Sequence, residues 1–186
     1  GLLVLPLFIY MLTRPIGTYN VNSKAQEPDP SKTPIKTMLI IYDPVLKKHG
    51  NVKLSQYYQW NDPKTLTNQL IGDLKEISHG NANYQVVETK EQDNWLPHEG
   101  NKRYTEDDYF TVYEHQSWDK GDADWNTFFA ENGILDKINS GGIDEVWLWA
   151  PPEGGYPESM MAGKDAYFVN WSPVPANAKG FVLMDY

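Results

Sequence analysis

The chain has 186 residues, which suits one compact domain. Its 16 basic and 25 acidic residues give a formal net charge of −9, so nucleic acids and anionic membrane surfaces, which bind basic faces, are poor partners. The absence of Cys excludes disulfides, thiolate nucleophiles and cysteine-ligated metals. A hydrophobic share of 40% excludes disorder throughout the chain.

The N-terminal region has two parts of different composition. Residues 1–12 form an uncharged apolar run, shorter than the roughly 20 residues that span a bilayer and close to the ~7–15 of a signal-peptide core. We expect an export signal or membrane anchor; a buried strand or helix is the alternative. Residues 13–34 are polar and rich in proline, which predicts a linker. The membrane is then a partner only through residues 1–12, and the folded domain spans residues 35–186.

Strands and helices alternate along the predicted domain. The continuous apolar run 37–42 predicts a strand that is buried on both faces. Asp62 as N-cap and Pro63 at the first helical position predict a helix that ends at Gly80. The remaining predicted elements are strand 84–88, helix 105–113, helix 124–141 with a potential break at Asn132-Gly133, strand 143–149 and strand 181–184.

This alternation is typical of βαβ units, and it predicts a three-layer α/β sandwich with a mainly parallel sheet. The printed chain stops at Asp185-Tyr186, directly after the last apolar strand, where a loop and a covering helix usually follow. We therefore expect the natural domain to continue beyond Tyr186.

Acidic residues follow several of the predicted strands. In parallel α/β sheets, ligands bind beyond the carboxyl ends of the strands, where this chain has Asp43, Glu88, the segment 151–155 and Asp185. Paired carboxylates are used in glycoside hydrolysis and in metal-assisted hydrolysis. We take Asp43 and Glu158 as the candidate catalytic acids. The alternative is that Asp43-Pro44 is only a turn and that the other acids are ordinary surface residues.

The segment 151–163 combines glycines, prolines and an aromatic residue, and Pro157-Glu158 within it predicts the first turn of a helix. Glu153 and Glu158 flank its glycine pair and would repel a phosphate, so a neutral polyol or a cation fits this loop better than a nucleotide. The candidate substrate-binding residues of the domain are Trp60, Asn61, Tyr156, Ser159 and Asn170.

Tryptophan side chains can stack on sugar rings when they are exposed. Trp147 and Trp149 alternate on one predicted strand, and we expect them to belong to the core. Trp60, just ahead of a predicted helix, and Trp95 are better candidates for exposure.

Metal-binding patterns are weak. The histidines show no HExxH or i,i+4 pairing. The run Asp122-x-Asp124-x-Asn126 copies the first ligands of a calcium loop, but Thr127 stands where Gly is required and Gly133 where Glu is required. We expect Asp124 to cap a helix, no metal site and no cofactor; calcium is the one cation with any support.

The motif IDEVWLW at 143–149, followed by Gly155-Tyr156 and Glu158-Ser159-x-Met161-Ala162-Gly163, resembles a group of uncharacterised secreted bacterial proteins. Some of them carry fibronectin type III or discoidin-like modules. The resemblance implies an exported α/β domain that runs on beyond Tyr186, points to Glu158, Ser159 and Asn170, and brings no reaction with it. In that group we expect an aromatic residue at the position of Glu153.

The function that we expect from the sequence is an exported or membrane-tethered hydrolase that acts on extracellular glycan or another surface polymer. The alternatives are a non-catalytic module that binds carbohydrate or a small polar ligand, and a purely structural extracellular domain.

Overall fold

The structure is a computed structural model that describes residues 33–100, 102–115 and 121–186. The predicted signal or anchor at 1–12, and the predicted linker at 13–34 apart from its last two residues, lie outside the described residues. No helix in the described part of the chain is long and apolar enough to cross a membrane.

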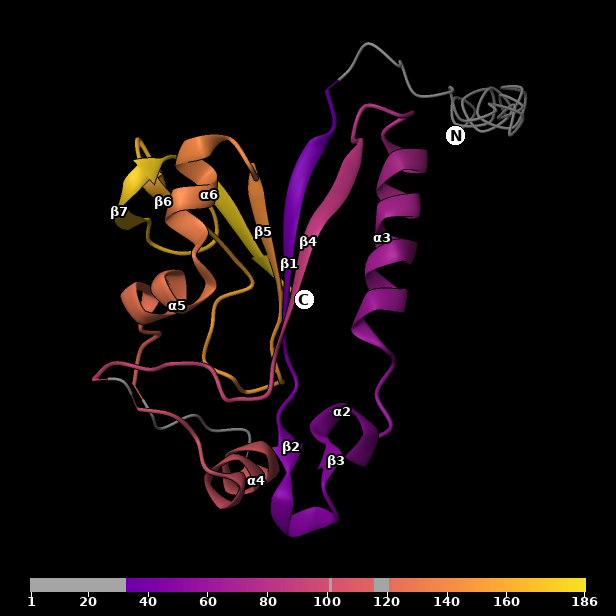
Figure 1. The fold of residues 1–186 in the computed structure, drawn as a ribbon, viewed down its shortest axis with the longest axis vertical. Helices are drawn as coiled ribbons and strands as arrows, with labels where there is room; N and C mark the ends of the chain where they lie inside the picture. Colours follow the sequence, from indigo (N-terminus) through magenta and orange to yellow (C-terminus); the bar gives the residue numbers. More distant parts are fainter. Residues whose placement is uncertain (1–32, 101, 116–120) are drawn as a thin grey trace, which may run out of the picture.

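A six-stranded sheet forms the centre of the domain, with the order β4-β1-β5-β8-β6-β7 (Figure 1). Neighbouring strands from β4 to β8 run parallel, and β6 is antiparallel to β8. The fold is therefore mixed α/β with a mostly parallel sheet, as predicted. The strands are β1 (Ile35–Tyr42), β4 (Tyr84–Gln92), β5 (Glu145–Trp149), β6 (Ser159–Lys164), β7 (Val174–Lys179) and β8 (Phe181–Asp185).

Strand β1 lies inside the sheet and is buried on both faces, as its continuous apolar sequence predicts. Met38 and Ile40 pack in one hydrophobic cluster, and Leu39 and Ile41 pack in another on the opposite face. All four side chains are at most 4% exposed. β1 pairs in parallel with β4 on one edge and with β5 on the other.

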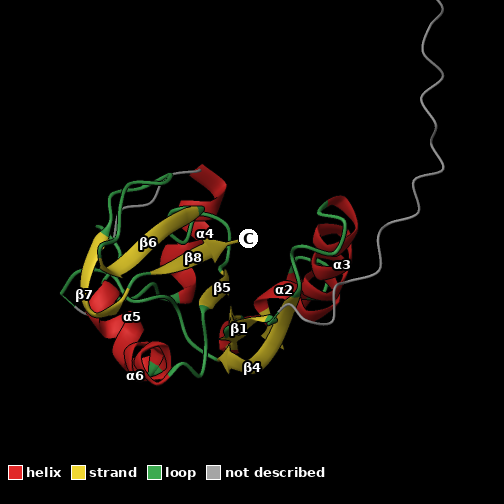
Figure 2. Cartoon of the chain, turned by 90° about the horizontal axis from the view of Figure 1, so that it is seen from above, coloured by secondary structure: helices red, strands yellow, loops and turns green. Residues whose placement is uncertain are grey.

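Helices flank the two faces of this sheet (Figure 2). Helix α3 (Pro63–Ile77) packs Leu70 and Leu74 against the cluster that contains Leu39 and Ile41. Helices α5 (Trp125–Asn132) and α6 (Ile134–Ser140) contribute side chains to the cluster on the other face.

Local hydrogen bonds define the helix ends. The Thr65 amide donates to Asp62 Oδ2 at 2.8 Å at the start of α3, and the Thr127 amide donates to Asp124 Oδ1 at 3.0 Å at the start of α5. Both predicted N-caps are confirmed. Gly133 has a φ of 65° and separates α5 from α6, so the predicted break is also confirmed.

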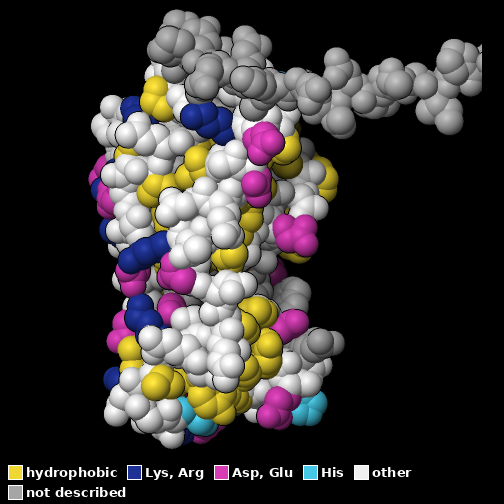
Figure 3. Space-filling model, turned by 90° about the vertical axis from the view of Figure 1, so that its right-hand side faces the viewer, with side chains coloured by type: hydrophobic (Ala, Val, Ile, Leu, Met, Phe, Trp, Pro, Cys, Tyr) yellow, Lys and Arg dark blue, Asp and Glu magenta, His cyan; other side chains and the backbone are white. Residues whose placement is uncertain are grey.

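A smaller hydrophobic cluster, rich in aromatic side chains, lies beyond the carboxyl ends of the strands, at the lower end of the view in Figure 1. Leu46, Leu54 and Tyr109 are fully buried in it. Seen from the side of α3, hydrophobic side chains gather toward this end of the molecule (Figure 3). Its elements are β2 (Val45–Leu46), a 3-10 turn (Lys47–His49), β3 (Val52–Lys53), α2 (Leu54–Tyr57) and α4 (Glu106–His115).

Three sequence predictions are wrong. Strand β4 continues to Gln92, so Glu88 lies within the strand instead of at its end and pairs with Lys137 at 2.6 Å. The chain after Pro157 forms strand β6 and no helix, because it pairs antiparallel with β8. Trp95, a candidate for exposure, is only 8% exposed, since its ring packs against Tyr109 with the ring centroids 4.6 Å apart, and the other candidate, Trp60, is half-buried.

We predict that Gly163→Ala destabilises the domain by ~3 kcal/mol or more, because it combines a left-handed backbone with an overpacked contact. Gly163 has a φ of +99°, and an added Cβ would lie 2.4 Å from the Lys179 carbonyl oxygen. Gly133→Ala is the matched control: its φ is +65°, but the nearest atom is a flexible Lys137 carbon at 3.8 Å. The control should lower the free energy of unfolding by about 1 kcal/mol. Urea denaturation measures the free energy of unfolding of both variants, and equal losses would contradict the prediction.

Candidate ligand-binding site

A cavity of about 300 Å³ opens outside the carboxyl ends of β1 and β5. From β1 the chain passes through α3 to β4, and it then crosses the opposite face through α5 and α6 to reach β5 on the other side of β1. The two crossover connections therefore cover opposite faces of the sheet, and they lead to strands on opposite sides of β1. Such a switch point is where open α/β sheets bind ligands.

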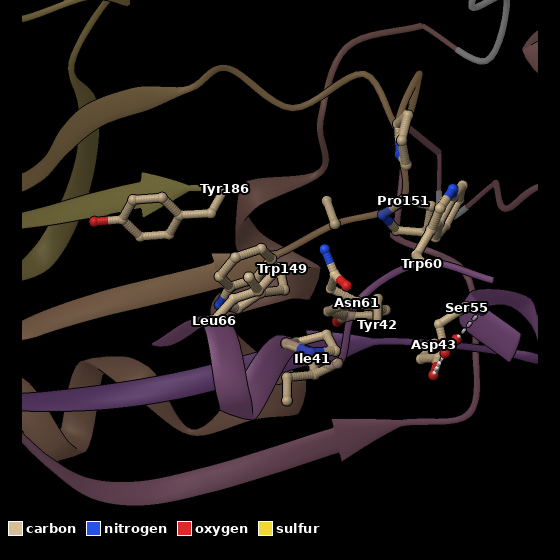
Figure 4. Close-up of a pocket in the computed structure, with 13 residues that line it drawn as sticks. Ile41, Tyr42, Asp43, Ser55, Trp60, Asn61, Leu66, Trp149, Pro151 and Tyr186 are labelled. Atoms are coloured by element: carbon tan, nitrogen blue, oxygen red, sulfur yellow. Dashed lines mark hydrogen bonds between the residues drawn. The ribbon is translucent and has the colours of Figure 1, made fainter. Parts of the chain in front are cut away.

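Aromatic side chains form much of the cavity wall (Figure 4). Trp149 at the end of β5 is held by a hydrogen bond from its Nε1 to Thr67 Oγ1, at 2.8 Å. The Tyr186 ring lies beside it, with the ring centroids 5.6 Å apart. Trp60 comes from the loop before α3 and stacks on Tyr58 at 5.0 Å with an interplanar angle of 11°. Aromatic rings thus border the cavity from three separate segments.

Asp43 supplies the carboxylate of the cavity. The Ser55 amide donates to its Oδ1 at 2.9 Å, and the Ser55 hydroxyl donates to its Oδ2 at 2.7 Å. Lys53 Nζ lies 3.9 Å from Oδ2. The Leu54 amide also donates to the Pro44 carbonyl at 2.9 Å, which fixes the start of α2 against the end of β1. Asp43 is consequently only 9% exposed, and its carboxylate is held in one orientation.

The other lining residues are mainly apolar, and Asn61 adds an exposed amide beside Trp60. Asp43 is the one acidic residue among the described residues that line this cavity. The structure therefore brings together Asp43, Trp60 and Asn61 of the predicted site. The full lining is Ile41, Tyr42, Asp43, Ser55, Trp60, Asn61, Pro63, Leu66, Trp149, Ala150, Pro151, Pro152 and Tyr186.

Glu158 does not lie with Asp43. The Glu158 carbonyl accepts a hydrogen bond from the Asp185 amide at the start of β6, and strands β5 and β8 lie between β6 and β1. Three strand spacings correspond to ~14 Å, which exceeds the ~5–10 Å that separate the carboxyl groups of glycosidases. Glu158 is exposed, and its carboxylate accepts from Asn170 Nδ2 at 3.4 Å. The half-buried Ser159 follows as the first residue of β6.

Tyr156 also lies away from Asp43. Its hydroxyl donates to the Pro97 carbonyl at 2.7 Å, and its ring packs on Trp125 with the centroids 4.8 Å apart. It lines a second cavity of about 290 Å³. The predicted site residues thus divide into two groups at different places on the domain.

Asp185 is the last residue of β8 and does not line the cavity. Leu183, two residues earlier, packs in the cluster of α5 and α6. Because side chains alternate along a strand, Asp185 points to that same face and Tyr186 points to the cavity. Burial raises the pKa of the Asp185 carboxyl to about 8, although the Ala150 amide donates to its Oδ1 at 3.1 Å.

The residues that sequence reasoning missed are Ser55, Trp149 and Tyr186. Trp149 was expected in the core because it alternates with Trp147; Trp147 is 1% exposed, whereas Trp149 is half-buried at the strand end. No sequence motif marks Ser55. It reaches Asp43 because it is the second residue of α2, whose first turn lies against the end of β1.

The described residues contain no group of three or more His, Cys, Asp and Glu side chains placed to hold a metal ion. In the calcium-like run, both carboxylate oxygens of Asp124 accept hydrogen bonds from Thr127, at 3.0 and 2.9 Å. Helix capping accounts for this residue.

Comparison of the chain with family models, curated proteins and solved structures found no match.

We predict that Asp185 makes folding stability depend on pH between about 4 and 8. An unfolded Asp ionises near pH ~3.9, whereas the folded carboxyl ionises near pH 8. As the pH rises from 4, ionisation therefore favours the unfolded chain, and the loss of stability ends once the folded group also ionises.

Asp185→Asn removes this titration and keeps an oxygen acceptor for the Ala150 amide. The variant should match the wild type near pH 4 and become progressively more stable than the wild type up to pH 8, as measured by urea denaturation at each pH. A constant difference across this range would contradict the assignment.

Proposed function

We propose that the chain is an exported three-layer α/β sandwich that binds a sugar ring of an extracellular glycan in the cavity beyond β1 and β5. The observation that carries the proposal is the grouping of Asp43, Trp60 and Asn61 around one cavity at the switch point of the sheet. Export is supported by the apolar segment 1–12 and the proline-rich segment after it.

The chemistry of the cavity suits a carbohydrate. Sugar rings have apolar faces of C–H groups, which pack on aromatic side chains, and hydroxyl groups at their edges, which need hydrogen-bond partners. Trp60 and Trp149 supply the aromatic surface, and Asp43 and Asn61 supply acceptors and donors. An apolar lining with few polar groups is also what a site of this size commonly has.

Binding is favoured over catalysis because the cavity holds a single carboxylate among its described lining residues. Glycoside hydrolysis uses two, one as acid and one as base or nucleophile. Hydrolysis is nevertheless a second candidate function, favoured by the two hydrogen bonds from Ser55 that orient the Asp43 carboxylate. A fixed and largely buried carboxylate could act as a general base.

We predict that Trp60→Ala weakens glycan binding by about tenfold or more, because an aromatic anchor is lost from the site. Wild-type and variant proteins would be tested for retention on insoluble cellulose, chitin and xylan, followed by calorimetry with oligosaccharides of the retained polymer. Tyr167→Ala is the control, since Tyr167 is 66% exposed and lies outside the lining of both cavities. Equal weakening by both variants would contradict this site, as would an unchanged affinity in Trp60→Ala.

The two candidate functions differ in the behaviour of Asp43→Asn. If the domain only binds, the wild type releases no reducing ends from the retained polymer, and the variant shows only a change in affinity. If the domain hydrolyses glycan, the wild type releases reducing ends, and the variant releases them at a rate at least about a hundredfold lower. We expect the first result; release of reducing ends that depends on Asp43 would establish the second.

A further inference from the structure

The second cavity has a chemistry unlike that of the first. It lies beside the start of α5 and the segment that precedes β6, and it has a volume of about 290 Å³. Three of its lining residues are aromatic and two are acidic, and none of the described residues that line it is basic. The lining comprises Glu99, Asp122, Ala123, Trp125, Gly155, Tyr156, Pro157 and Trp171.

Two of the aromatic walls are held rigidly. The rings of Trp125 and Tyr156 lie 4.8 Å apart with an interplanar angle of 62°, so their faces form a corner. The hydrogen bond from the Tyr156 hydroxyl to the Pro97 carbonyl fixes the far end of that ring. Phe128 packs behind it, with the ring centroids 5.6 Å apart. This corner therefore exists before any ligand binds.

The third ring comes from the loop between β6 and β7. Trp171 is 47% exposed, although it belongs to the lining of the cavity. The preceding residue, Asn170, is tied to Glu158 by the hydrogen bond at 3.4 Å. Trp171 thus presents an aromatic surface that a ligand could cover.

The acidic residues are positioned by backbone pairing. The Glu99 amide donates to the Asp122 carbonyl at 2.9 Å, and the Asp124 amide donates to the Pro97 carbonyl at 2.9 Å. Both the Glu99 and Asp122 side chains are exposed, and neither makes an ion pair with another described residue. Two negative charges therefore face a cavity with aromatic walls.

We propose that this cavity binds an alkylated ammonium group, with a trimethylammonium group such as that of choline as the best fit. Aromatic faces attract a cation through the ring quadrupole, and several rings around one methylated ammonium are a known means of recognising it. The carboxylates of Glu99 and Asp122 add a long-range attraction and repel anions. A calcium ion fits less well, since it requires six to eight oxygen ligands and aromatic rings supply none.

The test is calorimetric titration of the full chain with choline and with its neutral carbon isostere, in which a tert-butyl group replaces the trimethylammonium group. Both molecules have the same shape, so the comparison isolates the positive charge. Choline should bind at least tenfold more tightly than the isostere, and its affinity should fall as salt is added. Equal affinities, no choline binding, or displacement of choline by equimolar calcium would overturn the proposal.

Variants assign the binding to this cavity. Trp171→Ala should weaken choline binding at least fivefold, and the double variant Glu99→Gln with Asp122→Asn should do the same. The matched charge control is Asp73→Asn with Glu76→Gln on α3, which removes the same charge from exposed positions elsewhere. An equal loss in the control would show a general charge effect and overturn the site.

The trimethylammonium group could belong to a free solute or to a phosphatidylcholine headgroup. Cosedimentation with phosphatidylcholine vesicles distinguishes these sources when the wild type is compared with the Glu99 and Asp122 double variant, because both chains carry the same N-terminal segment. If the wild type binds vesicles and the double variant does not, the ligand is the lipid headgroup. If both proteins bind vesicles equally and only the wild type binds choline, the ligand is a free solute.

Discussion

The parallel pairing of β1 with both β4 and β5 is the constraint on which the rest of the structure depends. A strand that is hydrogen-bonded on both edges and buried on both faces must be apolar throughout, and β1 is. Its two parallel partners require crossovers, and these run over opposite faces of the sheet, which makes the end of β1 a switch point. Asp43 is the first residue after β1, so the sheet itself positions this carboxylate at the cavity.

Features that depend on neighbouring residues were predictable from the sequence. The apolar run of β1, the N-caps Asp62 and Asp124, and the break at Gly133 all rest on local hydrogen bonds or backbone preference. Features that depend on distant pairing were not. The edge strand β4 continues past Glu88 because it pairs with β1 as far as Gln92. The residues after Pro157 become a strand only because β8 lies beside them.

The candidate site divides along the same line. Asp43 and Asn61 come from turns that follow or precede predicted elements, and the sequence indicated both. Trp149 and Tyr186 reach the cavity because β5 and β8 end at the same edge of the sheet, which is a long-range fact. The sequence pattern groups Glu158 with Asp43 at the carboxyl ends of parallel strands. Glu158 does reach this edge of the sheet, beside Asp185, but strands β5 and β8 lie between it and β1. The result is two cavities of different chemistry, one with a single oriented carboxylate and one with aromatic rings and two acids.

The central claim is that the cavity beyond β1 and β5 binds a glycan. The most direct measurement is a titration of isotope-labelled protein with an oligosaccharide, followed by amide and indole NMR signals. The account predicts saturable shifts of the Trp60 and Trp149 indole signals and of the Asn61 and Ala150 amides, with the Trp125 indole unchanged. Shifts confined to Trp125 and its neighbours, or no saturable shift with any retained polymer's oligosaccharides, would contradict it.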